Sequence, residues 1–542
     1  MSLIKREKSG SNDKISRLLT NEYFVLALIL GIAAFLRFYG LNAKSIWYDE
    51  ACSLNLAAYN WYDTFFSSKV ITNIPRPGYF VFLKLWTGLF GWTEVAARSL
   101  SVILGILSVL LVYKLARKLF STPVGLISAF LLAISPYNIY YSQQIRYYAL
   151  FLCLSLLSLI FFLKILKDNK LKYRVLYILS NILILVTFPL GIYIIILENI
   201  FLFILRDRVK VKLPWLKIQA VILAGLLSMV LIHVVYLILH KGQDAIDFFA
   251  GPRPKPSFLA EALEVFSYGG YAQGHAGLGF PSDPSRLFFP RVLTVLFCSL
   301  FALSLFFRRR DGAVNKGFLR EDRTVLMLWL WLFLPLLGFY LFSIWFAPVY
   351  VTRYFLGIAP AFYIGIAYSI SRIRIVKPTA ILVISLLTVF SLDILYNPGS
   401  RNDWRALAKE IKPQVRSNDV IVFAPIMQII PFWYYYKYDR VKGFNNNIDN
   451  YGDKFYHMNN CVIDYGGNGI VGLGLKDDNN YILAALASAL KGKNNIWLIN
   501  SPHWAGRERS EFIRGILNDN RVVTYQKYFE YEGVEAICYS LP

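Results

Sequence analysis

The sequence predicts a polytopic α-helical membrane protein that ends in a small extracytoplasmic α/β domain. Of its 542 residues, 56% are hydrophobic and 16% are aromatic, far from the averages of soluble proteins. Apolar runs of about 20 residues, the length that crosses a bilayer, recur along residues 1–396. From residue 397 onward, short strand patterns and amphipathic helix patterns alternate, which predicts a second domain over 397–542.

About eleven apolar runs are long enough to be spans. They lie near residues 22–40, 99–119, 122–139, 147–164, 174–189, 190–205, 215–239, 287–307, 325–346, 353–371 and 376–396. The first run lacks a small-residue cleavage site, so we expect it to stay in the protein as an anchor and not to be removed as a signal peptide.

The distribution of Lys and Arg predicts the orientation, because these residues accumulate in cytoplasmic connections. They crowd the N-terminal arm and every second connection: 114–118, 164–174, 206–212, 308–323 and 372–377. The N-terminus is therefore predicted to be cytoplasmic. The odd number of spans then places residues 397–542 outside, in a multi-pass protein of the cell (plasma) membrane.

The formal net charge of +23 follows from these connections, so it indicates topology and anionic lipid, not nucleic acid. The five cysteines show no metal-ligand spacing and no disulfide framework. Only Cys461 and Cys538 share the outer domain, and they would be able to pair in an oxidising compartment.

Two predicted outer loops, 41–98 and 241–286, are long enough to have a function of their own. In the first, Arg76 lies in a turn bracketed by prolines. It is followed by a short apolar segment at 79–92, which we expect at the interface with Lys84 near the lipid headgroups. The second loop has a predicted helix at 257–267.

The tail has its own predicted elements. They are helices at 404–415 and 507–517 and strands at 420–423, 496–500, 522–529 and 536–540, with the glycine-rich stretch 466–474 read as a loop. The tail contains no phosphate-binding loop and no Gly-x-Gly-x-x-Gly fingerprint, so nucleotide binding there has no support.

Candidate functional residues lie at the predicted outer ends of the spans. Asp49 and Glu50 follow the first span, although carboxylates are costly near a bilayer and tend to mark function. Arg146 and Arg353 open the fourth and tenth spans. A guanidinium offers a fixed fork for phosphate oxygens, so this set would suit a lipid-phosphate substrate. Each arginine taken alone also fits an ordinary interface anchor.

Five motifs together resemble the GT-C glycosyltransferases, in the group related to protein O-mannosyltransferases and to the aminoarabinose transferases that modify lipid A. The motifs are 46–51 (Ile-Trp-Tyr-Asp-Glu-Ala), 77–80 (Pro-Gly-Tyr-Phe), 91–101, 135–148 and 353–356 with Pro360. The resemblance implies a GT-C-like catalytic module over 1–396. This module would transfer a hexose or pentose from a polyprenyl-phosphate carrier to a hydroxyl acceptor on a glycan, lipid or protein, at the outer face of the membrane.

The resemblance also implies roles for the acids. Asp49 would act as the general base or would orient the acceptor hydroxyl. Glu50 would support Asp49, or the two together would hold a divalent cation. The physical requirement agrees, because the donor already carries a phosphate leaving group and the enzyme needs a carboxylate near the acceptor.

On the donor side, Arg146 and Arg353 would neutralise the carrier phosphate, and Tyr147 and Tyr354 would pack on the sugar or the prenyl chain. Two positions depart from the family pattern. Gln143 and Gln144 stand where members often have Gln-Glu, which removes one carboxylate that would bind a metal, so a metal requirement is left open. The sequence 75–77 is Pro-Arg-Pro where members place His or Lys before a Pro-Pro turn, and Arg76 would supply that cation.

Two other classes of function remain. A transporter or flippase of lipid-linked sugars would be expected to show internal repeats and ionisable groups at the bilayer midplane, and neither is evident in the sequence. A family member without catalysis, binding glycans through its tail, would have no need for the intact Asp49, Glu50, Arg146 and Arg353.

Overall fold

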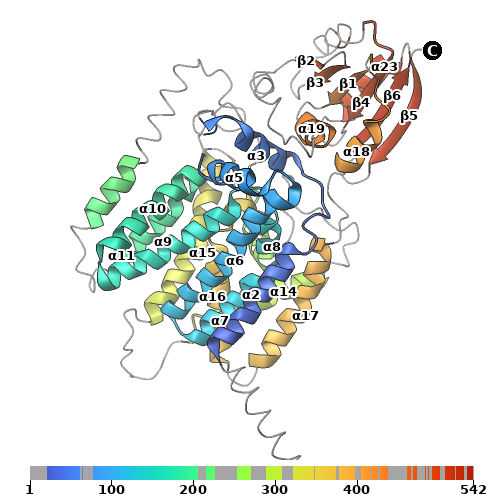
Figure 1. The fold of residues 1–542 in the computed structure, drawn as a ribbon. Helices are drawn as coiled ribbons and strands as arrows, with labels where there is room; N and C mark the ends of the chain where they lie inside the picture. Colours follow the sequence, from blue (N-terminus) through green and yellow to red (C-terminus); the bar gives the residue numbers. More distant parts are fainter. Residues whose placement is uncertain are drawn as a thin grey trace, which may run out of the picture. The chain divides into compact units, whose positions relative to one another are not determined.

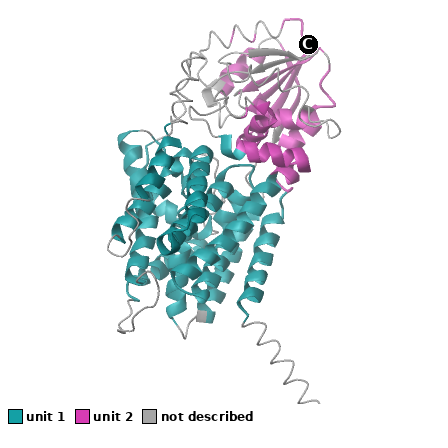
Figure 2. Ribbon diagram, turned by 60° about the vertical axis from the view of Figure 1, so that its left-hand side comes forward, with its two compact units in different colours: residues 1–41, 71–79, 98–397 teal, residues 42–70, 80–97, 398–542 magenta. Residues whose placement is uncertain are grey.

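The chain forms two compact units in a computed structural model (Figure 2). Unit 1 comprises residues 1–41, 71–79 and 98–397, and unit 2 comprises residues 42–70, 80–97 and 398–542. The structure describes residues 21–61, 64, 77–205, 215–225, 227, 253–269, 288–307, 321–346, 348–373, 377–396, 404–416, 418–424, 428–437, 461–465, 468–472, 483, 486, 491–500, 507–518, 521–529 and 534–540.

Unit 1 is built of apolar helices (Figure 1). They are α2 (Glu22–Phe38), most of α6 (Glu94–Leu119), α7 (Thr122–Ile134), α8 (Pro136–Ser142), α9 (Tyr148–Asp168), α10 (Leu171–Thr187), α11 (Ile192–Ile204), α13 (Ser257–Tyr268), α14 (Phe288–Leu303), α15 (Glu321–Trp345), α16 (Ala359–Arg372) and α17 (Lys377–Tyr396), with 3-10 turns η2 (Pro189–Gly191) and η6 (Thr352–Phe355). A further apolar helix spans Trp215–Gly225.

These helices lie in or next to the predicted apolar runs, except α13, which is the helix predicted in the second loop. Within the described residues, α6, α9 and α15 are each long and apolar enough to cross a membrane alone, and α7 with α8 forms a bent pair that would make a fourth span. The multi-pass membrane character is therefore confirmed, and the count of about eleven spans stays a prediction.

The run 122–139, predicted as one span, is broken. Helices α7 and α8 meet at an angle of 62°, because Pro136 has no backbone N–H to continue the helix. The fully buried Arg37 of α2 satisfies the backbone carbonyls at this break. Its guanidinium donates to the carbonyls of Leu132 (3.1 Å) and Ala133 (2.9 Å) at the end of α7.

A buried carboxyl ties three helices together inside unit 1. Glu198 of α11 accepts hydrogen bonds from the hydroxyls of Ser158 in α9 and Tyr177 in α10, both at 2.7 Å. Asn181 donates to the same Ser158 hydroxyl at 2.9 Å. Glu198 lies in the middle of α11, away from the helix ends where the sequence predicts the polar groups.

Unit 2 contains a six-stranded mixed sheet in the order β2-β3-β1-β4-β6-β5. Its strands are β1 (Val420–Ala424), β2 (Cys461–Tyr465), β3 (Asn468–Gly472), β4 (Asn495–Asn500), β5 (Val522–Phe529) and β6 (Val534–Ser540). Strand β1 pairs in parallel with β3 and β4, and the other pairs are antiparallel. Its helices are α3 (Tyr48–Ala58), most of α5 (Pro77–Phe90), α18 (Trp404–Ile411), α19 (Ile429–Lys437) and α23 (Arg507–Asn518).

Helices cover both faces of the sheet (Figure 1). Successive side chains of a strand point to opposite faces, so neighbouring residues of β1 pack against different helices. On one face, Phe423 of β1 packs with the helices α18 and α19. On the other face, Val422 packs with Ile513 of α23. A small mixed sheet in the C-terminal part of the chain is therefore confirmed, and the domain boundary at residue 397 and its extracytoplasmic location stay predictions.

One expectation for the tail is wrong, and one possible disulfide is excluded. The stretch 466–474, predicted as a loop, contains β3, which pairs with β1. Cys461 and Cys538 lie on β2 and β6, with three strands between them. Four strand spacings are about 19 Å, whereas a disulfide needs Cα atoms within about 7 Å, so this pair is excluded.

A glycine contact predicts how tightly the helices of unit 1 pack. A Cβ on Gly365 of α16 would lie 2.5 Å from the ring of Phe301 in α14, whereas a Cβ on Gly338 of α15 would meet nothing within 4 Å. We expect Gly365→Ala to destabilise the protein by about 1–3 kcal/mol through overpacking. Gly338→Ala should be neutral or stabilising by up to about 1 kcal/mol. Thermal unfolding of both purified variants checks this, and equal effects would contradict the packing of α16 on α14.

Candidate active site

The segment that carries Arg146 is a short irregular connection between α8 and α9. It is folded tightly, as the Arg146 N–H donates to the Gln144 carbonyl at 2.8 Å. The Ser101 hydroxyl of α6 donates to the Arg146 carbonyl at 3.4 Å. The Gln143 side chain donates to the carbonyls of Arg37 (3.1 Å) and Tyr39 (2.9 Å) at the end of α2. Two other helices therefore fix the backbone of Arg146.

Three aromatic rings connect Arg146 to Arg353, and we call Tyr147, Phe188 and Tyr354 the aromatic wall. The Arg146 guanidinium lies 5.2 Å from the centre of the Tyr147 ring. Tyr147 stacks on Phe188 at 5.4 Å between ring centres, and Phe188 contacts Tyr354 at 5.0 Å. The Arg353 guanidinium lies 5.7 Å from the Tyr354 ring. The structure thus places both arginines against one run of aromatic rings.

The wall is built where helices are interrupted. Helix α10 ends at Thr187, and η2 turns the chain into α11, with Phe188 at the corner. A Cβ on Gly191 in this turn would lie 2.6 Å from the ring of Phe151, so the turn packs closely on α9. Tyr137 of α8 fixes the other side, since its hydroxyl donates to the Thr352 carbonyl at 2.7 Å.

Three buried neutral polar side chains lie within three residues of a wall residue along the chain. Gln144 and Thr187 are fully buried, and Thr352 is 7% exposed. The Gln144 amide atoms and both threonine hydroxyls have no hydrogen-bond partner in the described part of the chain. Such buried groups need a partner, and a ligand is one way to supply it. Gln144 stands out in the sequence as a departure from the family pattern, whereas the two threonines carry no such signal, although Thr352 adjoins Arg353.

Asp49 and Glu50 lie in the first turn of α3 in unit 2. Glu50 is fully buried, and its carboxylate accepts the Trp47 N–H at 3.5 Å, which closes the start of the helix. The Ser53 hydroxyl donates to the Asp49 carbonyl at 2.9 Å. Asp49 is partly exposed. The helix N-terminus also favours negative charge, which stabilises both carboxylates in this turn.

Lys84 of α5 caps the other end of α3. Its ammonium donates to the carbonyls of Ala57 (3.1 Å) and Tyr59, and it lies 5.2 Å from the Trp61 ring. This gives Lys84 a structural role, while its contact with donor or lipid stays a prediction. Arg76 lies outside the described residues.

The expected site residues are divided between the units (Figure 2). Arg146, Tyr147, Arg353 and Tyr354 belong to unit 1, whereas Asp49, Glu50 and Lys84 belong to unit 2. Within the described ranges, no three His, Cys, Asp or Glu side chains gather into a group suited to a metal ion. A divalent cation on Asp49 and Glu50 stays a prediction.

Comparison with known protein families matches one part of the chain. Residues 74–236 match the family model described as dolichyl-phosphate-mannose-protein mannosyltransferase. No curated protein matches the chain.

Similar solved structures cover nearly the whole chain. ArnT from Cupriavidus metallidurans, solved bound to undecaprenyl phosphate, has a TM-score of 0.57 at 12% identity and covers 94% of this chain and 97% of its own. The oligosaccharyltransferase AglB from Archaeoglobus fulgidus, solved in complex with an inhibitory peptide and a dolichol-phosphate, has a TM-score of 0.50 at 13% identity and covers 96% of this chain and 74% of its own. At these identities the likeness shows the fold.

Proposed function

From the relation of this chain to the GT-C membrane glycosyltransferases, we propose that it transfers a sugar from a polyprenyl-phosphate carrier to a hydroxyl acceptor at the outer face of the cell membrane. The observation that carries the proposal is the pair of arginines at the two ends of the aromatic wall. Arginine is suited to planar recognition of phosphate oxygens, and two of them would hold one phosphate from two sides.

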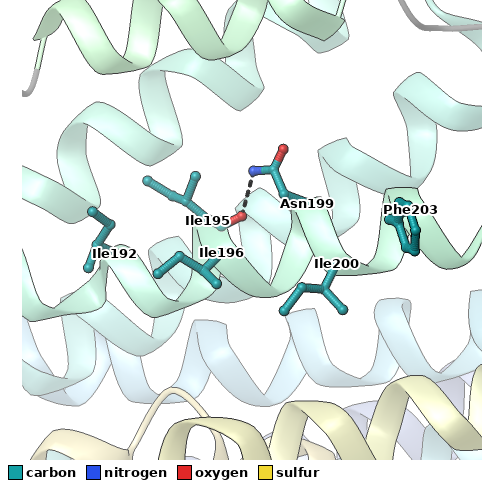
Figure 3. Close-up of a pocket in the computed structure, with 6 residues that line it drawn as sticks. All are labelled: Ile192, Ile195, Ile196, Asn199, Ile200 and Phe203. Carbon is teal, nitrogen blue, oxygen red and sulfur yellow. Dashed lines mark hydrogen bonds between the residues drawn. The ribbon is translucent and has the colours of Figure 1, made fainter. Parts of the chain in front are cut away.

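The prenyl chain has an apolar path next to the wall. Helix α11 begins just after Phe188 and η2, and a hollow of about 440 Å³ lies along it, lined by Ile192, Ile195, Ile196, Asn199, Ile200 and Phe203 (Figure 3). The Asn199 amide is satisfied within the protein, since it donates to the Ile195 carbonyl at 2.8 Å and accepts from Trp215 at 2.9 Å. The hollow therefore offers hydrocarbon contact, which supports its use by a polyprenyl tail.

In the proposed reaction the acceptor oxygen attacks the anomeric carbon of the donor sugar, and the bond from that carbon to the phosphate oxygen breaks. Asp49 takes the hydroxyl proton as the new bond forms. The departing polyprenyl phosphate gains negative charge, which Arg146 and Arg353 stabilise. Glu50 supports the proton transfer indirectly, because its hydrogen bond from the Trp47 N–H stabilises the first turn of α3, which carries Asp49.

The neutral groups around the wall support an uncharged donor sugar. Gln144, Thr187 and Thr352 offer amide and hydroxyl groups that would pair with sugar hydroxyls, and none of them carries a charge that would balance an amino group. Each is buried, so a sugar that left them unpaired would bind poorly. A neutral hexose or pentose is therefore the donor sugar that this set fits best.

One observation favours transport of a lipid-linked sugar as a second function. Glu198 is a carboxyl buried among the helices α9, α10 and α11, as a transporter's coupling site would be. Its hydrogen bonds to Ser158 and Tyr177, however, are those of an interhelical tie. Transfer is therefore the function proposed.

The catalytic assignment is tested with Asp49→Asn. We expect transfer from labelled undecaprenyl-phosphate sugars to fall by about 10²–10⁴-fold, the usual contribution of a general base. The sugars tried should include mannose, glucose, arabinose and aminoarabinose, in membranes that contain the acceptor pool. Unchanged transfer by Asp49→Asn would contradict the assignment of Asp49 as the base. Transport would be supported if the parent chain transferred none of the sugars but moved the lipid-linked sugar between leaflets.

The donor side is tested with Arg146→Lys and Arg353→Lys. Lysine keeps the charge and loses the planar fork. We expect each variant to raise the KM for the donor about tenfold, as a charge-assisted hydrogen bond is worth about 1.5–3 kcal/mol. Arg323→Lys serves as a control, because its guanidinium donates to the Ile204 carbonyl, away from the wall. Equal donor KM values in all four proteins would remove both arginines from the donor site.

The neutral set is tested with Gln144→Glu. A carboxylate at this position should favour a cationic amino sugar, so we expect the ratio of kcat/KM for aminoarabinose over arabinose donors to rise at least about tenfold, which is about 1.4 kcal/mol. Thermal unfolding of the variant shows whether the buried charge is tolerated. A parent enzyme that already prefers the amino sugar would contradict the assignment of a neutral donor.

A further inference from the structure

The segment before Asp49 is held by a side chain that is distant in sequence. The hydroxyl of Tyr435, on α19, accepts the N–H of Ile46 at 2.6 Å. Ile46 directly precedes Trp47, the N-cap of α3, and lies three residues before Asp49. Helix α19 also packs against α3. All of these residues belong to unit 2.

The same hydroxyl belongs to a small, partly buried network. Tyr435 donates to the carboxylate of Glu94, the first residue of α6. Glu94 is 8% exposed. Glu94 also receives the Arg405 guanidinium of α18, whose Nε lies 3.2 Å from Oε1. We call Tyr435, Glu94 and Arg405 the clasp.

The clasp holds the approach to α3 at two points. Arg405 donates to the Asn42 carbonyl from both terminal nitrogens at 3.2 Å, four residues before the Ile46 contact. Its guanidinium also lies 5.9 Å from the centre of the Tyr435 ring. Residues 42–46 are therefore anchored at both ends by side chains of the C-terminal domain.

The clasp is held by an ion pair and by a hydrogen bond to a carboxylate. Burial alone would lower the pKa of the Arg405 guanidinium, yet the neighbouring Glu94 and Tyr435 outweigh burial and raise it. The Arg405 guanidinium therefore keeps its positive charge beside Glu94. Charge-assisted hydrogen bonds in partly buried surroundings are stronger than neutral ones, so residues 42–46 are held more firmly than by van der Waals contact alone.

We propose that the clasp residues are positioning residues for Asp49, so that the C-terminal domain takes part in the transfer reaction by setting the direction in which α3 begins. The inference rests on the proposed function, in which Asp49 removes the acceptor proton. A displacement of about 1 Å at a reacting group is enough to cost about 10²-fold in rate, and Ile46 is only one peptide away from the cap of α3.

Tyr435→Phe tests the inference, because it removes the hydroxyl and keeps the ring. We expect kcat for sugar transfer to fall about tenfold with the donor KM unchanged, as an interaction felt mainly in the transition state should behave. Tyr525→Phe is the matched control. It removes a tyrosine hydroxyl that donates to Glu410 at 2.6 Å in the same domain, and it should leave kcat unchanged.

A double-mutant cycle separates positioning from general loss of stability. In the Asp49→Asn background, Tyr435→Phe should change the residual rate by less than about twofold, since residues that act as a unit are not additive. Additive losses would overturn the inference. So would full kcat in Tyr435→Phe when Asp49→Asn is impaired, and that result would leave the proposed function standing. Full transfer by Asp49→Asn would overturn both.

Hydrogen exchange gives a readout that needs no catalysis. The amide of Ile46 donates to Tyr435, so a peptide covering residues 44–50 should exchange at least about tenfold faster in Tyr435→Phe than in Tyr525→Phe, both in the full-length protein. Equal exchange in the two variants would overturn the clasp.

Discussion

The whole arrangement of unit 1 depends on the satisfaction of backbone groups at helix breaks. Inside a bilayer an unpaired carbonyl is costly. A helix can end there only if other groups of the protein donate hydrogen bonds to its last carbonyls. The buried guanidinium of Arg37 does this for α7, whose last carbonyls it binds. The Gln143 side chain does the same for the end of α2. Because the last carbonyls of α7 and α2 are hydrogen-bonded in this way, the chain can turn at 143–147 and place Arg146 at the aromatic wall.

The units divide the proposed reaction between them. Unit 1 supplies the groups suited to the donor: two arginines, the wall and the neutral amide and hydroxyls. Unit 2 supplies the acid on α3, together with the helices that hold that acid in place. In this proposal the C-terminal sheet with its helices, which carries no nucleotide motif, has a part in the reaction. It fixes the start of α3 through Tyr435 and Arg405.

The fold could be read largely from the sequence, because apolar length and strand alternation are local signals. The break at Ser135 and Pro136 was hidden, as the residues on both sides are apolar. The site could be predicted only in part. Arg146 and Arg353 stand out by charge, whereas Thr187 and Phe188 matter only because α10 ends beside α9 and Tyr354. Lys84 has the charge of a phosphate ligand, yet the carbonyls that it binds at the end of α3 become neighbours only on folding.

The central claim is that Arg146 and Arg353 bind one lipid phosphate at the aromatic wall. A cryo-EM map of the full-length protein in nanodiscs with undecaprenyl phosphate tests it most directly. The account predicts phosphate density within about 3 Å of both guanidiniums, the distance of a charge-assisted hydrogen bond. It also predicts that the prenyl chain leaves along α11. A headgroup resolved elsewhere, with neither arginine in contact with it, would contradict the account.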